Sequence, residues 1–324
     1  MRNTFLDCTR GLGICLVVFG HVQRGLSDAH LLPANYPVTQ IDFTLYTFHM
    51  PLFFLLAGLY VWPALEKGRG SFIGSKFMTI VVPYFVWSII QGGVQIAMAH
   101  STNHPLSLSD WPKLFYAPLG QFWFLYALMI WQIVAFACGR RGPALMVVAI
   151  LALAFSTALP DSILSTTMKM GIFFAAGAAI GPGLERHVAS FAHWKSFLVC
   201  CGAFGLAVHA IWNVAPVYSW QALPAAIFGM GIIMIVCYRA NQMLAKAPLV
   251  LCGQRSMHIY VMHIMAAAGI RIVLTKAGVD NGYALLLIGT AAGIVLPLGV
   301  SHALQRAGSL VRGTLPATRT GMQS

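Results

Sequence analysis

Long apolar runs, separated by short polar segments, cover nearly the whole chain. About ten of them reach roughly 16–25 residues, the length that an α-helix needs to cross the hydrocarbon core of a bilayer. Backbone groups in lipid must be paired within the chain, so such runs form helices. The pattern predicts an all-α, polytopic transmembrane helical bundle of about ten spans. Their approximate limits are 8–26, 41–64, 77–99, 120–138, 144–159, 166–184, 196–214, 220–238, 249–273 and 282–303.

Composition agrees with this pattern. The chain has 324 residues, of which 58% are hydrophobic and 9% are charged, and its mean hydropathy is +0.76. A soluble domain of this length could not cover its surface with so few charges. The net charge of +12 raises the question of nucleic-acid binding. The basic residues are scattered between apolar runs and not gathered on one element, so we expect no nucleic-acid partner.

The distribution of Lys and Arg predicts the orientation. With the N-terminus in the cytoplasm, thirteen of these residues fall in cytoplasmic segments and four in outer segments. This positive-inside bias predicts that both termini are cytoplasmic. We expect one membrane domain over 1–303, followed by a short polar cytoplasmic tail over 304–324. Arg10 interrupts the first apolar run and no small-residue cleavage pattern follows it, so that run is expected to be a retained helix and not a signal peptide.

The seven cysteines lie in or beside apolar runs. Their positions show neither a disulfide framework nor metal-ligand spacing, so we interpret them as small buried hydrophobic residues. They are Cys8, Cys15, Cys138, Cys200, Cys201, Cys237 and Cys252.

Ionisable residues inside the first span are the strongest functional signal. Arg10 and His21 are eleven positions apart, which puts them on one helix face about 16 Å apart along the axis. Asp7 falls on the same face and can hold the Arg10 guanidinium. Charged groups in membranes normally face a cavity, a partner or a substrate path. A neutral imidazole can take a proton from an attacking hydroxyl. The alternative is a structural histidine bonded to a backbone carbonyl.

A proline in the second span predicts a break in the helix and a cavity beside it. Pro51 lacks a backbone donor, so the helix is expected to kink or break there, with carbonyls freed for partners inside the protein. His49, expected just before the break, is placed to line the resulting cavity. The alternative, that His49 only caps the broken backbone, stays open.

Basic residues gather before the third span, at Lys67, Arg69 and Lys76. Lys and Arg beside glycines allow close approach to phosphates, such as those of coenzyme A. The positive-inside bias alone also places basic residues here. Tyr84, in the span that follows, is grouped with them as a donor-binding candidate.

Two later spans carry polar or amphipathic residues. The fourth span opens with the segment 121–125, where an aromatic belt at the membrane interface is the simplest interpretation, and Trp123 in this segment is also a candidate for lining the substrate cavity. Ser256, Tyr260 and His263 follow the spacing i, i+4 and i+7 and form a polar stripe on one helix face. Such a helix is expected to face the bundle interior, with these side chains lining a substrate cavity.

Several blocks of residues, in order along the chain, carry a resemblance to a known family. They are Arg10 with His21, the segment 49–58, Lys76 with 82–84, the segment 123–125, and Gly253 with Ser256, Tyr260 and His263. Together they resemble acyltransferase family 3 of integral-membrane O-acyltransferases, especially its short fucose 4-O-acetylase-like branch. The resemblance covers nearly the whole chain.

The resemblance implies transfer of an acyl group, with acetyl expected, from cytoplasmic acyl-CoA to a sugar hydroxyl of a cell-envelope or exported glycan. It implies a bacterial inner (plasma) membrane protein whose partners are acyl-CoA, a glycan or glycolipid acceptor and membrane lipid. Acetyl-CoA enters as donor substrate, and no metal is expected. The implied catalytic set is His21, Arg10 and Asp7, with His21 acting either as base or as transient acyl carrier.

A secondary transporter or flippase for a lipid-linked sugar is the alternative, because intramembrane Arg and His with a broken helix suit that class too. Two expectations oppose it: no matching broken helix in the second half of the chain, and no intramembrane carboxylate to couple ions. Acidic residues number only eight in the whole sequence.

Overall fold

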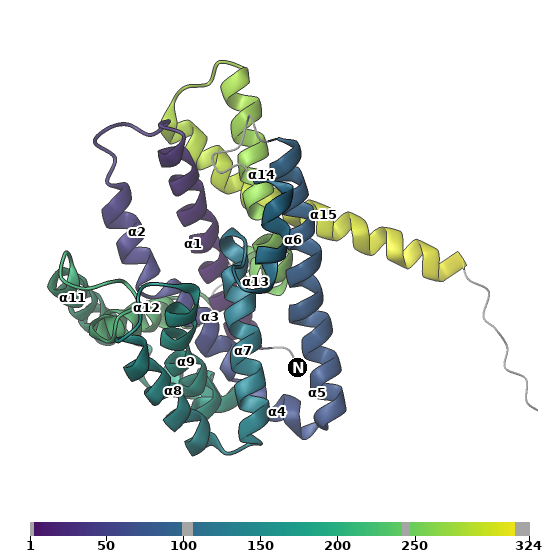
Figure 1. Cartoon of the computed structure of the whole chain (residues 1–324). Helices are drawn as coiled ribbons and strands as arrows, with labels where there is room; N and C mark the ends of the chain where they lie inside the picture. The colour runs from purple at the N-terminus through teal and green to yellow at the C-terminus, as the bar shows by residue number, and fades with distance from the viewer. Residues whose placement is uncertain (1–2, 99–105, 242–246, 315–324) are drawn as a thin grey trace, which may run out of the picture.

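The computed structural model of the chain is a bundle of α-helices (Figure 1). It describes residues 3–98, 106–241 and 247–314, and within these ranges it contains no β-strand. The α-helices are α1 (Thr4–Asp28), α2 (Val38–Tyr46), α3 (His49–Gly58), α4 (Val61–Glu66), α5 (Arg69–Lys76), α6 (Val82–Ala97), α7 (Trp123–Cys138), α8 (Gly142–Ser156), α9 (Ile163–Ile180), α10 (Leu184–Phe191), α11 (Trp194–Ile211), α12 (Leu223–Asn241), α13 (Ala247–Gln254), α14 (Ser256–Lys276) and α15 (Gly282–Thr314).

The predicted fold class, a polytopic helical bundle, is confirmed. In the described part of the chain, nine helical segments are long and apolar enough to cross a membrane. Where ten spans were expected, the tenth is α8, which is apolar but has only 15 residues. All seven cysteines are free.

α1 is the central helix, and glycines bring α13 against its first turns. A Cβ added to Gly11 would lie 1.8 Å from the carbonyl oxygen of Leu249, and one added to Gly253 would lie 1.7 Å from that of Asp7. These positions therefore allow backbone-to-backbone contact that no other residue permits. The contact fixes the N-terminal half of α1, which carries Arg10.

Contacts between segments distant in the chain lie near both ends of α1. At the end where α1 begins, Asn3 donates to Glu185 at 2.7 Å. Near the opposite end of α1, Arg271 donates to the carbonyl oxygen of Gly25 at 3.0 Å. Gly282 lies against Leu31 so closely that an added Cβ would be 2.3 Å from its carbonyl oxygen. These contacts hold α14 and the start of α15 beside the C-terminal end of α1 (Figure 1).

The break in the second span lies earlier than expected. α2 ends at Tyr46 and α3 begins at His49, so His49 follows the break and does not precede it. Pro51 occupies the first turn of α3, where a backbone N–H has no intrahelical acceptor in any case. The proline therefore starts a helix here and does not interrupt one.

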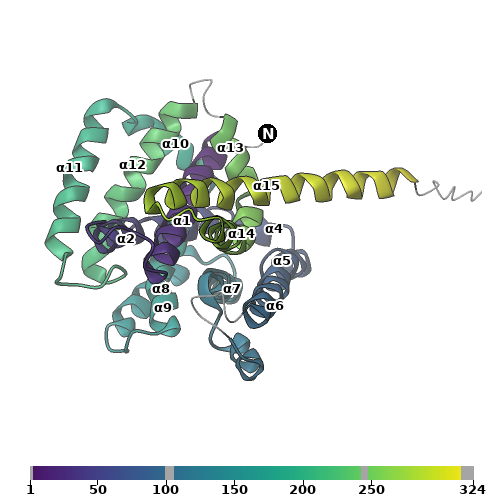
Figure 2. The same cartoon turned by 90° about the horizontal axis from the view of Figure 1, so that it is seen from above.

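Two further boundaries differ from the expected spans. The expected span 249–273 is divided at Arg255 into α13 and α14, so the expectation of no second broken helix was wrong. α15 continues to Thr314, so part of the expected tail from 304 is helical, and 315–324 lie outside the described residues. Figure 2 shows the later part of α15 extending away from the bundle.

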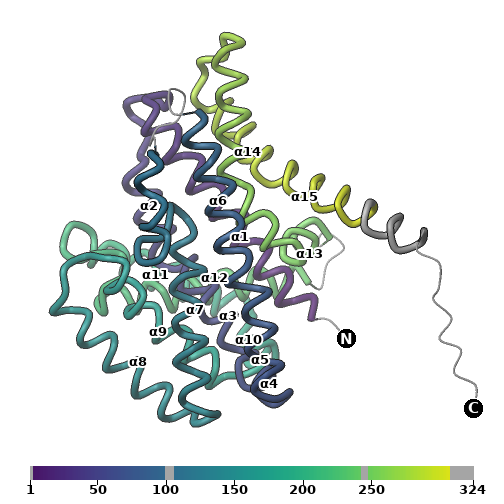
Figure 3. Tube along the Cα trace, turned by 45° about the vertical axis from the view of Figure 1, so that its right-hand side comes forward, coloured from purple at the N-terminus to yellow at the C-terminus, as the bar shows by residue number. Residues whose placement is uncertain are grey.

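A π-helical turn over Phe77–Val81 joins α5 to α6. Pro83 lies at the start of α6, and a proline lacks the N–H and crowds the carbonyl of the preceding turn. The wider turn accommodates it without a sharp break. α5 and α6 therefore form one long rod at the edge of the bundle (Figure 3).

Candidate functional site

Two cavities lie along α1, one beside each of its ionisable residues. The large cavity has a volume of about 550 Å³ and is lined by His21, and the small cavity has about 170 Å³ and is lined by Arg10. Binding sites for small molecules commonly have volumes of about 300–1,000 Å³. The other polar and aromatic side chains that line the large cavity are Arg24, Asp28, Tyr46, Gln91, Gln95, Gln121, Trp123, His263 and Arg271.

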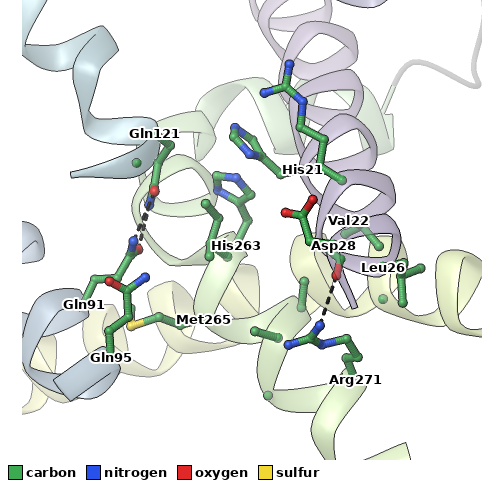
Figure 4. Close-up of a pocket in the computed structure, with 18 of the residues that line it drawn as sticks. His21, Val22, Leu26, Asp28, Gln91, Gln95, Gln121, His263, Met265 and Arg271 are labelled. Carbon is green, nitrogen blue, oxygen red and sulfur yellow. Dashed lines mark hydrogen bonds between the residues drawn. The ribbon is translucent and has the colours of Figure 1, made fainter. Parts of the chain in front are cut away.

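His21 presents a half-buried imidazole to the large cavity. In the described part of the chain no hydrogen bond to this ring is found, so neither nitrogen is committed to a backbone carbonyl. The structural-histidine alternative required such a bond. Figure 4 shows the ring on the cavity wall, beside that of His263. Chemically, a free imidazole of this kind can accept a proton from a hydroxyl placed in the cavity.

His263 approaches His21 from α14. The two ring centroids are 5.1 Å apart and the ring planes are tilted by 52°. The Nδ1 atom of His263 lies 2.7 Å from the carbonyl oxygen of Tyr260 and 3.1 Å from that of Ile259. The structure thus brings together two sequence candidates, His21 and His263, that are far apart in the chain.

Arg24 was not among the expected site residues, but it lies on α1, which continues to Asp28, and it lines the large cavity. Its Nε and Nη2 each donate to Asp42 at 2.6 Å, and its Nη1 donates to the Tyr46 hydroxyl at 2.8 Å. All three guanidinium nitrogens are therefore used. Arg24 lies three residues after His21, so helix periodicity places both on one face, and this spacing could have identified Arg24 from the sequence.

An amide pair forms another part of the wall. Gln91 and Gln121, both buried, donate to each other at 3.2 and 2.7 Å (Figure 4). They join α6 to the turn before α7. The Tyr260 hydroxyl donates to the carbonyl oxygen of Gln121, which ties α14 to the same turn. Neither glutamine was among the site residues expected from the sequence.

The small cavity holds Arg10 together with Ser256 and Tyr260, two members of the predicted polar stripe. Its other lining residues are apolar or aromatic. Asp7 is 1% exposed, and its Oδ1 lies 3.4 Å from Nη1 of Arg10, the contact expected from their spacing. Gln254 of α13 donates to Oδ2 of the same carboxylate at 3.4 Å. Asp7 is thus anchored from two helices and can orient Arg10.

The predicted donor-binding residues do not line either cavity. Lys67 and Arg69 are exposed near the start of α5, and the Arg69 guanidinium lies 5.1 Å over the ring of Phe136. Lys76 is half-buried at the end of α5. Tyr84 is buried, and its hydroxyl donates to the carbonyl oxygen of Leu114, so it supports the packing of that segment.

The two remaining sequence candidates are placed differently. Trp123 lines the large cavity and contacts the ring of Tyr218. His49 is 1% exposed and does not line that cavity. Its Nδ1 bonds to the carbonyl oxygen of Leu45, in the last turn of α2, and its ring lies edge-on to Tyr46 at 4.4 Å. This geometry matches the alternative in which His49 caps the broken backbone.

No group of three or more His, Cys, Asp or Glu side chains that could hold a metal occurs within the described ranges. The cavity walls offer hydrogen-bonding and aromatic groups. Arg24, Asp28 and Arg271 add charged groups to the large cavity, so its wall suits a polar ligand.

Comparison with known proteins identifies relatives. The model of the family described as "Acyltransferase domain" matches residues 3–304. Nodulation protein NolL of Mesorhizobium japonicum is 28% identical over 138 residues, and that of Sinorhizobium fredii is 27% identical over 135 residues. Each alignment covers 40% of this chain and 34% of the relative, so the chain matches about a third of the length of these proteins. No solved structure shows significant similarity to the chain.

Proposed function

The chain belongs to acyltransferase family 3 and is an acyltransferase, and we propose that it transfers an acetyl group from acetyl-CoA to a sugar hydroxyl. The acceptor is a cell-envelope or exported glycan, or a glycolipid. One observation carries the proposal: α1 places His21, whose imidazole has no hydrogen bond within the described residues, in the wall of a cavity of about 550 Å³. The same helix places Arg10 in a second cavity nearer its N-terminal end.

The donor enters from the end of the bundle where α1 begins. We place this end in the cytoplasm of a bacterium, with both termini there, because the Lys and Arg bias favours that orientation. Exposed Lys67 and Arg69 hold the phosphates of the CoA, with Lys76 half-buried beyond them. Arg10, oriented by Asp7, donates to the thioester carbonyl or the pantetheine arm as the donor passes the small cavity.

The chemistry takes place at His21. One of its ring nitrogens accepts the proton of the acceptor hydroxyl as that oxygen attacks the thioester carbonyl carbon. The new C–O bond forms and the C–S bond breaks. The CoA thiolate leaves and takes the proton from the imidazolium, so His21 returns to its neutral form. Of the two roles open to His21, we favour the base because the large cavity beside it has room for an acceptor.

The large cavity holds the acceptor. Each amide of the Gln91–Gln121 pair keeps a second N–H beyond the mutual bonds, and the Trp123 ring offers an aromatic surface. Both are groups that sugar rings bind. The cavity lies toward the C-terminal end of α1, which faces the outside in the proposed orientation. Donor and acceptor then meet within the bundle, and no separate transporter is needed.

A transporter remains the rival for the same residues, and the second broken helix, at Arg255, removes one argument against it. Family membership supports the acyltransferase instead.

The test uses the purified full chain in lipid nanodiscs, with a panel of envelope glycans and acetyl-CoA labelled in the acetyl group. We expect label to appear on at least one glycan in proportion to the protein added. Acetyl-CoA labelled in the adenine ring is the matched control, and it should leave every glycan unlabelled. If acetyl-CoA neither binds nor transfers its label to any glycan in the panel, the proposed donor is wrong.

A further inference from the structure

His263 carries a buried nitrogen that no described group satisfies. Its Nδ1 faces the carbonyl oxygens of Tyr260 and Ile259, at 2.7 and 3.1 Å. A carbonyl oxygen only accepts, so Nδ1 carries the hydrogen, and Nε2 of the neutral ring has a lone pair. The residue is 0% exposed, and Nε2 has no hydrogen-bond partner in the described structure. Unsatisfied buried polar atoms are uncommon and call for an explanation.

The ring of His21 lies at the distance that such a partner would have. When two imidazoles share a nitrogen-to-nitrogen hydrogen bond, their centroids are about 5 Å apart, given a bond of about 2.9 Å. The observed separation is 5.1 Å, with the rings tilted by 52°. The bond therefore needs a rotation of the His21 side chain and no movement of α1 or α14. Both rings line the large cavity (Figure 4).

Two other sets of polar groups in the cavity wall are already paired. Arg24 has only donors, and both carboxylate oxygens of Asp42 already accept from it. The side-chain amides of Gln91 and Gln121 are paired with each other. In the described part of the cavity wall, Nε2 of His263 is the buried acceptor that is both unused and beside His21.

We propose that His263 is the positioning residue for His21. Its Nε2 accepts the N–H of His21, so the other nitrogen of His21 carries a lone pair and faces the acceptor hydroxyl. This inference rests on the proposed function, in which His21 is the base. During transfer the hydroxyl proton moves to the free nitrogen of His21, and the thiolate later removes it. The proton that His21 shares with His263 stays between the two rings throughout.

The role resembles that of the carboxylate that orients a catalytic histidine in hydrolases, which fixes the tautomer and supports the imidazolium. A neutral imidazole does this without a negative charge, which would be costly to bury in a membrane. His263 can accept only because the Tyr260 and Ile259 carbonyls hold its own hydrogen on Nδ1. The backbone of α14 thus fixes the tautomer of His263, and His263 in turn fixes the tautomer of His21.

Two substitutions of His263 distinguish a role in positioning His21 from a role in packing alone. In His263→Asn the side-chain amide falls near the position of Nδ1, so it keeps a donor for the Tyr260 carbonyl and has no atom at Nε2. In His263→Gln the terminal amide reaches the position of Nε2, and its oxygen can accept from His21. The full chain is labelled with ¹⁵N-histidine in nanodiscs, and the His21 resonances are those absent from His21→Gln. Nitrogen chemical shifts report which ring nitrogen is protonated.

We expect one neutral tautomer of His21 in the wild type and in His263→Gln, and a mixture of both in His263→Asn. We also expect kcat to fall at least about tenfold in His263→Asn, with KM for acetyl-CoA unchanged, and to recover largely in His263→Gln. An unchanged tautomer and unchanged kcat in His263→Asn would overturn the proposal. If that variant does not fold, two His21 tautomers in the wild type would overturn it. The tautomer measurement does not depend on turnover, so its failure is distinct from failure of the proposed function.

Discussion

At the residue scale, Arg10 combines a buried partner with access to a cavity. Its side chain is 29% exposed, whereas Asp7, 3.4 Å away, is 1% exposed. Removing the guanidinium therefore takes a charged partner from a carboxylate that the fold buries, which is more costly than losing an exposed pair. In the proposed function the exposed part of Arg10 is what the donor contacts.

Arg10→Ala should weaken acetyl-CoA binding. A hydrogen bond from a charged group contributes about 1.5–3 kcal/mol, so Kd should rise roughly 10- to 150-fold. Arg10→Lys keeps the charge without the planar fork of donors and should be intermediate. Calorimetry with the protein in nanodiscs measures this, and Arg141→Ala, which removes an exposed positive charge outside both cavities, is the matched control. Equal binding to the wild type and Arg10→Ala would remove Arg10 from the donor site.

Several of these contacts could be predicted from the sequence, and others could not. Asp7 with Arg10, and Ser256 with Tyr260, are one helical turn apart, so local periodicity was sufficient to group each pair. Gln91 and Gln121 meet only because α6 packs beside the turn before α7. The same applies to His21 and His263, since helix periodicity says nothing about which helices are neighbours.

At the element scale, the contact between α1 and α13 fixes where Arg10 and Asp7 lie. Hydropathy showed one continuous span over 249–273, and the division at Arg255 could not be read from it. An apolar run looks the same whether it is straight or broken, because hydropathy carries no information on backbone direction. The contact of Gly253 with Asp7 is the local feature that accompanies the break.

Gly11→Ala should destabilise the protein. The new Cβ would lie 1.8 Å from the Leu249 carbonyl oxygen, so α13 must move, and overpacking of this kind commonly costs about 1–3 kcal/mol or more. Gly25→Ala is the control in the same helix, since its Cβ would meet nothing within 4 Å. Thermal unfolding in detergent should show a lower midpoint for Gly11→Ala and an unchanged or higher one for Gly25→Ala. Identical midpoints for Gly11→Ala and the wild type would show that α13 does not pack on α1 in this way.

At the scale of the whole molecule, the topology depends on α8. Its 15 residues have a length of about 22 Å, shorter than the hydrocarbon core of about 30 Å. If α8 crosses the membrane with α9 beside it, the number of spans is even and both termini are on one side. A short apolar helix can cross where the bilayer thins locally around it.

Reporter fusions test this topology. A reporter inserted after Ala34 should be outside, one after Arg141 should be in the cytoplasm, and one after Asp161, between α8 and α9, should be outside. The insertion after Asp161 is the most informative because it depends on the short helix. A cytoplasmic result there would show that α8 does not cross, and reversal of the first two results would place His21 near the cytoplasm.

The central claim is that His21 performs acyl transfer, and the most direct measurement is the rate at which His21→Ala moves the acetyl label from acetyl-CoA to the acceptor. Loss of a general base typically lowers the rate by about 10²–10⁴-fold. We predict a loss of this size in protein that is inserted and elutes as the wild type does. His209→Ala, at an exposed histidine of α11 away from both cavities, should transfer normally. Near-normal transfer by folded His21→Ala would contradict the account.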